Sequence, residues 1–412
     1  MLHPPVPRRR SEPVRNLDPK PDAPSNVRNI FGTIRSSVPG TLLCEHLPDI
    51  ARQTHRCAII RSAWHRYTGH FGGHRYALTG FPAPGNADQP ARADDRPGLV
   101  GLAKKHLSER RRLFPSTVML PWIATDQGSG ASGGMGGGIL GRQYDPVLVE
   151  TDTRSPERPG MPVFRIPEFA LQPGVTAERL GERRSLLQVV EGQRREMQND
   201  SERELGSFYD SAYSLLTSDR IKEGFDLERE DARRRVRYGA NAFGQSCLLA
   251  RRLVERGARF VQVNFCRFVT QNGYGWDTHG RGAETLGRHL LPKLNAGLGA
   301  LLDDLADRAL LDETLVVAMG EFGRTPNVKA DGGRDHWPQC YSLLMAGGGI
   351  HGGLLFGKSD RTGARPAEDP VEARQILMTI LTLLGVPTFQ TDPQGRAAPL
   401  FEGVEPVRRL YE

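Results

Sequence analysis

The sequence predicts an α/β fold in which a mostly parallel sheet is covered by helices on both faces. Three apolar runs of strand length lie in the second half, RFVQVNF (259–265), TLVVAM (314–319) and YSLLMA (341–346). A long helix is predicted over residues 284–310, where leucines recur at three- and four-residue spacing. Strands that alternate with helices favour a parallel sheet, so we expect these three strands to be neighbours in one sheet.

Other elements follow from the same patterns. An amphipathic helix is predicted over residues 231–256, ended by Gly257, and a closing helix over residues 371–384. In the first half, CAIIR (57–61) is typical of a buried strand, and residues 116–123 of a second strand.

We expect one large domain with a lead-in and an insertion. Residues 1–22 are rich in Pro and Arg and are predicted to be a disordered lead-in to an α/β domain over residues 23–412. Residues 177–230 are highly charged and are predicted to be a helical insertion. The Gly-rich stretch 128–141 resembles a flexible lid or connector, since no Gly-Lys-Ser/Thr follows to make it a phosphate loop.

Composition excludes several classes of protein. The net charge is +7, but 55 basic and 48 acidic residues are mixed and the basic runs lack aromatics, so no nucleic-acid partner is expected. The five cysteines form no CxxC pair, which excludes a zinc knuckle and a disulfide framework. No apolar run approaches the roughly 20 residues that span a bilayer. Nothing in the composition indicates an oligomeric state.

Three loops at the ends of the predicted strands carry side chains that bind metals or anions: GWDTH supplies Asp277 and His279, GEFGR supplies Glu321 and Arg324, and GRDHW supplies Asp335 and His336. Carboxylates and imidazoles together suit a divalent ion. Ligands of such sheets bind at one edge, so the loops are expected to converge. The alternatives are turn-forming aspartates with surface histidines, and an Arg–Glu pair that fixes a loop. His351, within a run of glycines, is predicted to be a loop residue and not a ligand.

This order of loops and strands resembles the core of the alkaline-phosphatase superfamily, which includes the sulfatases. More closely, the chain is identified as a member of the sulfatase-like domain of unknown function 1501 family. The strings that carry this resemblance lie between residues 17 and 384: DPKPDAP (18–24), PGTLLCEHLP (39–48), IIRS (59–62), HRYALTG (74–80), YGANAFGQSCLLARRLVERG (238–257), GWDTHG (275–280), GEFGRTP (320–326) and GRDHWP (333–338).

The resemblance implies a metal site. Asp277, His279 and His336 take the positions of one ion's ligands, with Asp335 beside them, and Glu321 takes the position that serves a second ion. The ion would be zinc, manganese or calcium. HFGGHRYALTG (70–80) falls where sulfatases carry their nucleophile, so His70 stands in the nucleophile's place.

By the same resemblance the protein would hydrolyse a small anionic ester of phosphate or sulfate. Arg324 would hold the anion, and His70 or His74 would act as general base towards a water activated by the ion. The alternative is a non-catalytic binding or structural module on the same fold, because fold alone does not decide function. Two departures bear on the choice: no Ser, Thr or Cys stands at the nucleophile position, and Phe322 replaces the His that usually follows the strand-end carboxylate. The absence of the family's usual first strand favours the alternative, whereas the retained Asp and His residues favour hydrolysis.

Family members usually begin with a twin-arginine export signal and a first strand that ends in Gly-Gly-Pro-Ser-His. Here the family pattern begins at Asp18 without either feature. The expectation is therefore a cytoplasmic protein as the sequence is written, or a gene model that starts late.

Overall fold

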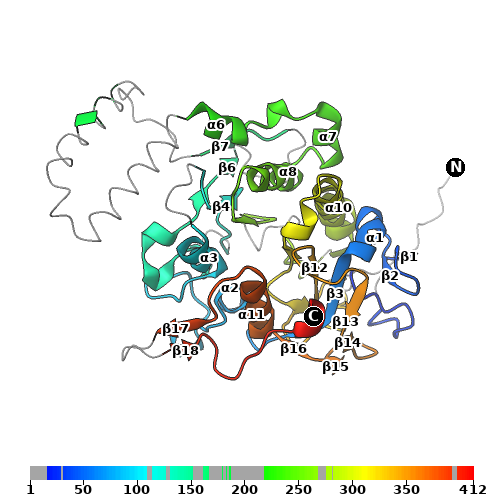
Figure 1. The fold of residues 1–412 in the computed structure, drawn as a ribbon. Helices are drawn as coiled ribbons and strands as arrows, with labels where there is room; N and C mark the ends of the chain where they lie inside the picture. Colours follow the sequence, from blue (N-terminus) through cyan, green and yellow to red (C-terminus); the bar gives the residue numbers. More distant parts are fainter. Residues whose placement is uncertain are drawn as a thin grey trace.

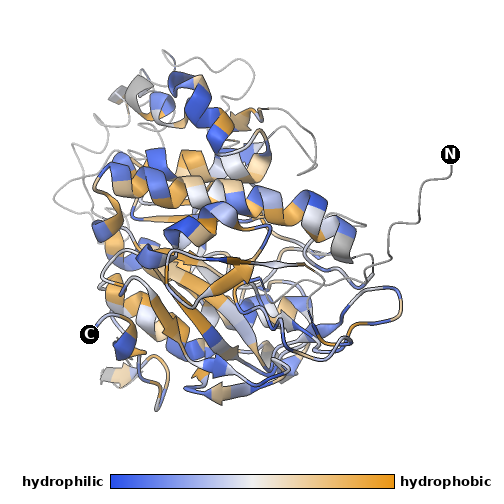
Figure 2. Cartoon of the chain, turned by 90° about the vertical axis from the view of Figure 1, so that its right-hand side faces the viewer, coloured by the Kyte–Doolittle hydropathy of each residue, from blue (hydrophilic) through white to orange (hydrophobic). Residues whose placement is uncertain are grey.

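The computed structural model describes residues 16–28, 31–108, 114–126, 130–151, 161–166, 179, 182, 185–186, 218–267, 275–280, 282–391 and 397–412. In Figure 1, β3 (Cys57–Trp64) and β12 (Tyr341–Ala346) lie between α10 (Leu291–Asp307) on one side and α2 (His70–Thr79) and α11 (Ala373–Leu383) on the other. The strands are mostly hydrophobic, and the outward sides of the helices are hydrophilic (Figure 2). The chain is therefore a mixed α/β protein, as the sequence predicts.

The larger sheet is built around β3 (Cys57–Trp64) and has five strands. Its order is β13 (Leu354–Phe356), β3, β12 (Tyr341–Ala346) and β9 (Val316–Ala318), and β16 (Val371–Glu372) also pairs with β3. The β13 and β16 strands run parallel to β3, whereas β12 runs antiparallel to both β3 and β9. Consequently β12 alone runs against the other four strands.

The smaller sheet has three parallel strands, in the order β5 (Val147–Leu148), β4 (Thr117–Leu120) and β8 (Phe260–Val263). Within the described residues, β8 and β9 each pair along one edge only. The expectation that all three C-terminal strands are neighbours in one largely parallel sheet is therefore wrong. RFVQVNF contributes to one sheet, and TLVVAM and YSLLMA form an antiparallel pair in the other.

The connection between β9 and β12 explains that antiparallel pair. Parallel neighbours need a crossover, usually a helix. Residues 319–340 contain no helix and instead form a hairpin of β10 (Gly323–Arg324) and β11 (His336–Trp337). The chain therefore turns back on itself, and β12 returns beside β9 in the opposite direction.

Both faces of the larger sheet are buried because alternate residues of β3 face opposite helices. Ile60 packs in the same hydrophobic cluster as α11 (Ala373–Leu383). Its neighbour Ile59 packs with α1 (Pro48–Gln53) and α10 (Leu291–Asp307). Such an arrangement needs a continuous apolar run, which CAIIR supplies.

The predicted helix over residues 284–310 is present, with a change of pitch near its start. It consists of α9 (Gly282–Thr285), one π-helical turn (Leu286–Leu290) and α10. Pro292 stands in the first turn of α10. Proline has no N–H to donate to the preceding turn, so an ordinary α-helical ladder cannot run through this point.

The predicted helix over residues 231–256 is broken into α7 (Ala232–Arg237) and α8 (Ala242–Glu255). Gly239 has a φ of +93°, which ends the first helix, and the side chain of Asn241 caps the second by accepting from the N–H of Gly244. Periodicity alone does not show this break because the apolar spacing continues across it.

The Gly-rich stretch packs closely against α3 (Leu99–Leu107). A Cβ on Gly98 would lie 1.7 Å from the carbonyl oxygen of Gly134, and one on Gly101 would lie 2.6 Å from that of Gly136. These glycines let two backbones touch. In its described part, the stretch thus packs against α3, and its predicted role as a lid or connector stays a prediction.

The remaining elements are α2 (His70–Thr79), α6 (Asp219–Phe225) and four two-stranded ladders: β1 (Thr33–Arg35) with β2 (Leu42–Cys44), β6 (Glu150–Thr151) with β7 (Phe164–Arg165), β14 (Lys358–Ser359) with β15 (Pro366–Glu368), and β17 (Phe389–Thr391) with β18 (Ala397–Pro399).

Parts of two predicted segments lie outside the described residues. Residues 1–15 of the predicted lead-in lie outside the described residues. Asp18, in the described part of the lead-in, is buried and accepts a hydrogen bond from the hydroxyl of Ser359. Most of the predicted insertion over residues 177–230 also lies outside the described residues, and α6 lies in its described end. No helix in the described ranges has the length and apolar character needed to cross a bilayer.

A buried ion-pair cluster joins α8 to α10. The Arg251 side chain is 1% exposed and lies 2.7 Å from Glu230, 2.9 Å from Asp304 and 2.6 Å from Glu255. Burial by itself would raise the pKa of Glu230, but hydrogen bonds from Arg251 and Arg252 lower it to about 2. The cluster is therefore ionised at neutral pH.

We predict that Glu230→Gln destabilises the protein at pH 7 by about 3 kcal/mol, the equivalent of moving a carboxyl pKa from about 4.3 to about 2. Because the folded-state pKa is the lower one, this stability is complete above about pH 4.3 and is lost as the pH falls towards 2. Urea unfolding at pH 7 and pH 3.5 should show the difference between the two proteins narrowing by about 1 kcal/mol, since pH 3.5 is still above the folded-state pKa of about 2. Exposed Glu228→Gln is the control, and an equal loss there would contradict the prediction.

Candidate metal centre

The direction of β12 brings the candidate residues to one edge of the larger sheet. The carboxyl end of β3 leads to His70 at the start of α2, and that of β9 leads to Glu321. His336 lies on β11, just before β12 begins. Because β12 is antiparallel to β3 and β9, its beginning lies at the edge where they end. Asp277 comes to this edge from the loop that follows β8.

The carboxylate of Asp277 is the centre of the cluster. Its side chain is 2% exposed. The Oδ2 atom lies 3.1 Å from Nε2 of His70, and Oδ1 lies 2.9 Å from Nε2 of His336 and 3.0 Å from Nε2 of His279. Arg324 adds a guanidinium nitrogen 2.6 Å from Oδ1. A buried carboxylate is thus surrounded by three imidazoles and one cation.

The histidine rings are held by their other nitrogens. The Nδ1–H of His70 donates to Oε1 of Glu321 over 3.0 Å. The Nδ1–H of His336 donates to the backbone carbonyl of Thr68 over 2.5 Å. Both acceptors lack a proton to give, so each Nδ1 carries a hydrogen. Towards Asp277 each Nε2 presents a lone pair when the ring is neutral and an N–H when the ring is protonated. Metal-binding histidines are usually oriented in this way.

His279 follows the same pattern nearer the surface. Its Nδ1–H donates to Oδ1 of Asp335 over 2.8 Å, and the same oxygen accepts from Lys329 over 3.0 Å. Asp335 is half exposed, and the His279 ring lies between its carboxylate and that of Asp277. The predicted ligand Asp335 therefore orients a ligand-type histidine and does not join the central cluster.

The β10–β11 hairpin places Arg324 opposite His336. The two residues are paired in register, so their side chains lie on the same face of the hairpin. Arg324 is buried and also donates to the backbone carbonyl of Trp276 over 3.0 Å. The structure thus pairs Arg324 with Asp277, and its predicted role in holding an anion stays a prediction.

Helix α2 presents His70 and His74 one turn apart on one face. Nε2 of His74 lies 3.7 Å from Oε2 of Glu321, and its Nδ1 lies 3.3 Å from the hydroxyl of Ser132. A Cβ on Gly73 would lie 2.9 Å from the Phe322 ring, so glycine lets that ring pack against α2.

Burial and charge together set the pKa values in the cluster. Burial would raise the pKa of Asp277, but hydrogen bonds from His336 and His70 and the charge of Arg324 hold it far below its usual range. Burial would lower the pKa of His70, yet the carboxylates of Asp277 and Glu321 raise it to about 9. Burial lowers the pKa of His74.

The donor set fits a divalent ion. Ligand atoms of His70, Asp277 and His336 all lie within 4.8 Å of one another. The Nε2 atom of His70 is buried and makes no hydrogen bond, although a carboxylate oxygen is 3.1 Å away. The Nε2 atoms of His279 and His336 are 3.1 Å apart, near the roughly 3.3 Å expected for two nitrogens bound at about 2.0–2.1 Å to one tetrahedral ion.

Three contributors to this site were not predicted. His65 donates from Nε2 to the backbone carbonyl of Glu321 over 2.5 Å. The Phe322 ring centre lies 4.4 Å from that of His336 and forms an apolar wall. His65 stands just after a buried strand, which was a usable signal. The carbonyl of Thr68 carries no signal, because any residue supplies one.

Comparison with known proteins identifies the family. The family model described as "Protein of unknown function (DUF1501)" matches residues 3–410. The chain belongs to this family. No curated protein matches the chain by sequence.

Three solved structures are similar to the chain at low identity. They are Ps i-CgsB (10% identity, TM-score 0.39, 83% of this chain and 67% of that chain), its complex with k-i-k-neocarrahexaose (11%, 0.40, 83% and 67%) and PsFucS1 sulfatase from Pseudoalteromonas sp. (14%, 0.35, 82% and 62%). The chain thus covers about two thirds of the length of these proteins. At these TM-scores the functional argument rests on the site itself.

We predict that Glu321→Ala weakens binding of Zn²⁺ by about 10- to 100-fold, the usual effect of removing a group that orients a ligand. Glu321→Gln should recover much of this loss, because an amide oxygen still accepts from Nδ1 of His70. Chelator competition measures both affinities. If Glu321→Ala instead removes one whole equivalent of bound metal, Glu321 is itself a ligand.

Proposed function

We propose that this protein is a metal-dependent hydrolase of phosphate or sulfate esters on an alkaline-phosphatase-like fold. The observation that supports it best is the convergence of three imidazole Nε2 atoms on the buried carboxylate of Asp277, with each ring anchored through Nδ1. When bound there, a divalent ion would stabilise the negative charge that develops on an ester.

The donor set selects among the ions considered. Imidazole nitrogens suit zinc and other transition metals, whereas calcium takes six to eight oxygen ligands. Three histidines around one carboxylate therefore favour zinc over calcium, with manganese as the weaker alternative. Phe322 shields one side of the cluster from water, which strengthens every charge interaction within it.

The residues of the chain divide the remaining tasks. Arg324 offsets the charge of Asp277 and fixes its orientation. Nδ1 of His70 is held by Glu321 and its Nε2 faces Asp277, where it would bind the ion, so we do not assign His70 as the base. We assign the general base to His74, whose lowered pKa keeps its ring neutral at pH 7 and whose Nε2 lies 3.7 Å from Glu321.

A second candidate function is metal binding without catalysis. It is favoured by the histidine at the nucleophile position, and by the commitment of Arg324 to Asp277 in place of a substrate anion. The two functions share the ion and differ only in turnover.

The two candidate functions can be distinguished by an activity assay. The full chain, loaded with Zn²⁺ or Mn²⁺, is tested for hydrolysis of 4-nitrophenyl phosphate and 4-nitrophenyl sulfate. We predict turnover that a chelator abolishes and that Asp277→Asn and His336→Ala each reduce by at least about 100-fold, the scale of losing one main electrostatic stabiliser. His351→Ala is the control, because His351 is exposed and only its backbone N–H is bonded in the structure, to Leu410. Stoichiometric metal without turnover of either ester would support the non-catalytic function.

A further inference from the structure

The four ligand-type side chains around the candidate ion differ in how firmly they are held. The exposed fractions are 2% for Asp277, 5% for His70 and 18% for His336, but 43% for His279. A side chain that is nearly half exposed loses much less packing when it moves than a buried one does. Exposure therefore separates His279 from the other three.

The groups that anchor the rings differ in the same way. The carboxylate of Glu321, which holds His70, is 15% exposed, and its backbone carbonyl accepts from His65. The carbonyl of Thr68, which holds His336, belongs to the backbone. Asp335, which holds His279, is 55% exposed. Of the two carboxylate anchors, that of His279 is therefore the more open to solvent.

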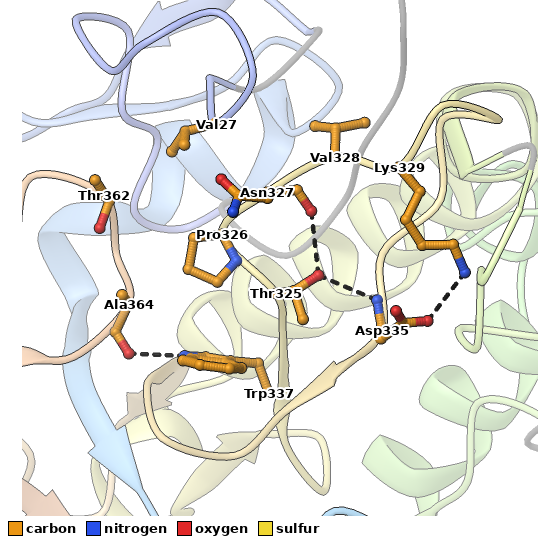
Figure 3. A pocket seen from close by; sticks show the side chains of 10 residues that line it. All are labelled: Val27, Thr325, Pro326, Asn327, Val328, Lys329, Asp335, Trp337, Thr362 and Ala364. Atoms are coloured by element: carbon orange, nitrogen blue, oxygen red, sulfur yellow. Dashed lines mark hydrogen bonds and ion pairs between the residues drawn. The ribbon is translucent and has the colours of Figure 1, made fainter.

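Asp335 is also shared. Its Oδ1 accepts from Lys329 as well as from His279, and both Asp335 and Lys329 line a pocket of about 580 Å³. Figure 3 shows the Lys329 ammonium reaching Asp335 at the side of this pocket. A contact between Lys329 and an anion in this pocket would compete with the Lys329–Asp335 pair.

The backbone of His279 is closely packed. A Cβ on Gly333 would lie 1.6 Å from the carbonyl oxygen of His279, so the two backbones are in close contact. A change of the His279 rotamer would withdraw its imidazole from Asp277 without moving the loop.

We propose that His70, Asp277 and His336 hold the ion permanently, and that His279 is an exchangeable fourth ligand that leaves when an oxyanion binds. Catalytic zinc sites keep three protein ligands and one open position. Here the open position is closed by His279 in the resting protein. Exchange of His279 rests on the metal ion of the proposed function but does not require ester hydrolysis. It makes His70 a ligand of that ion, although the resemblance places His70 where sulfatases carry their nucleophile.

Affinity for Zn²⁺ tests the division of ligands. In chelator competition with the full chain, His70→Ala should weaken Zn²⁺ binding by more than about 100-fold, beyond the range for an orienting group, and His279→Ala by less than about 10-fold. His351→Ala should match the wild type. The reverse ranking of His70→Ala and His279→Ala would overturn the proposal.

Inorganic phosphate tests the exchange. With Co²⁺ in the site, phosphate should alter the visible absorption of the wild type, and it should bind several-fold more tightly to His279→Ala, where no imidazole competes. Equal phosphate affinity in the two proteins would refute exchange.

X-ray absorption on the Zn²⁺-loaded wild type gives a result that does not depend on any variant folding. It should count three imidazoles without phosphate and two with saturating phosphate. A count that stays at three excludes His279 as the leaving ligand. Because none of these measurements requires hydrolysis, a protein that exchanges His279 but turns over no ester would refute the proposed function alone.

Discussion

The burial of the Asp277 carboxylate is the constraint on which the site depends. An ionised carboxylate at 2% exposure is costly unless it is paired and hydrogen-bonded. Arg324 supplies one charge, and His70 and His336 supply nitrogens that become further donors only when protonated. In the absence of an ion, the cluster thus offsets its charge with protons. A divalent cation replaces those protons, so metal binding and proton release at this carboxylate are one equilibrium.

The reversed direction of β12 explains how residues from distant parts of the chain reach Asp277. In an all-parallel sheet, a loop that precedes a strand lies at the opposite edge from loops that follow its neighbours. His336 precedes β12, so a parallel β12 would have placed it far from Glu321. The β10–β11 hairpin reverses the chain and pairs His336 with Arg324 in the process. This one hairpin therefore reverses the direction of β12 and places His336 opposite Arg324.

Sequence periodicity predicted the fold class and most element positions, because burial on both faces imposes apolar runs on the strands. Asp277, His279 and His336 were selected by their ligand chemistry beside strand ends and by the family resemblance. Periodicity did not predict the antiparallel pair, although the convergence of the loops requires it, since no apolar pattern encodes strand direction. The groups that orient the histidines are harder to assign from the sequence. Asp335 and Glu321 were noticed as acids and given roles as ligands, because a sequence does not show which way a carboxylate points.

The substitutions at positions 70 and 322 belong together. Phe322 stands where the resemblance places a histidine for a second ion, and its ring packs 5.5 Å from the ring of His70 and 4.4 Å from that of His336. Gly73 leaves the space that this ring needs. An aromatic ring in that place offers no ligand, and Glu321 orients His70. A nucleophile at position 70 would need a free side chain, whereas a histidine fixed by Glu321 is suited to bind an ion. The contact with Glu321 therefore favours an ion-binding role for His70 over that of a nucleophile.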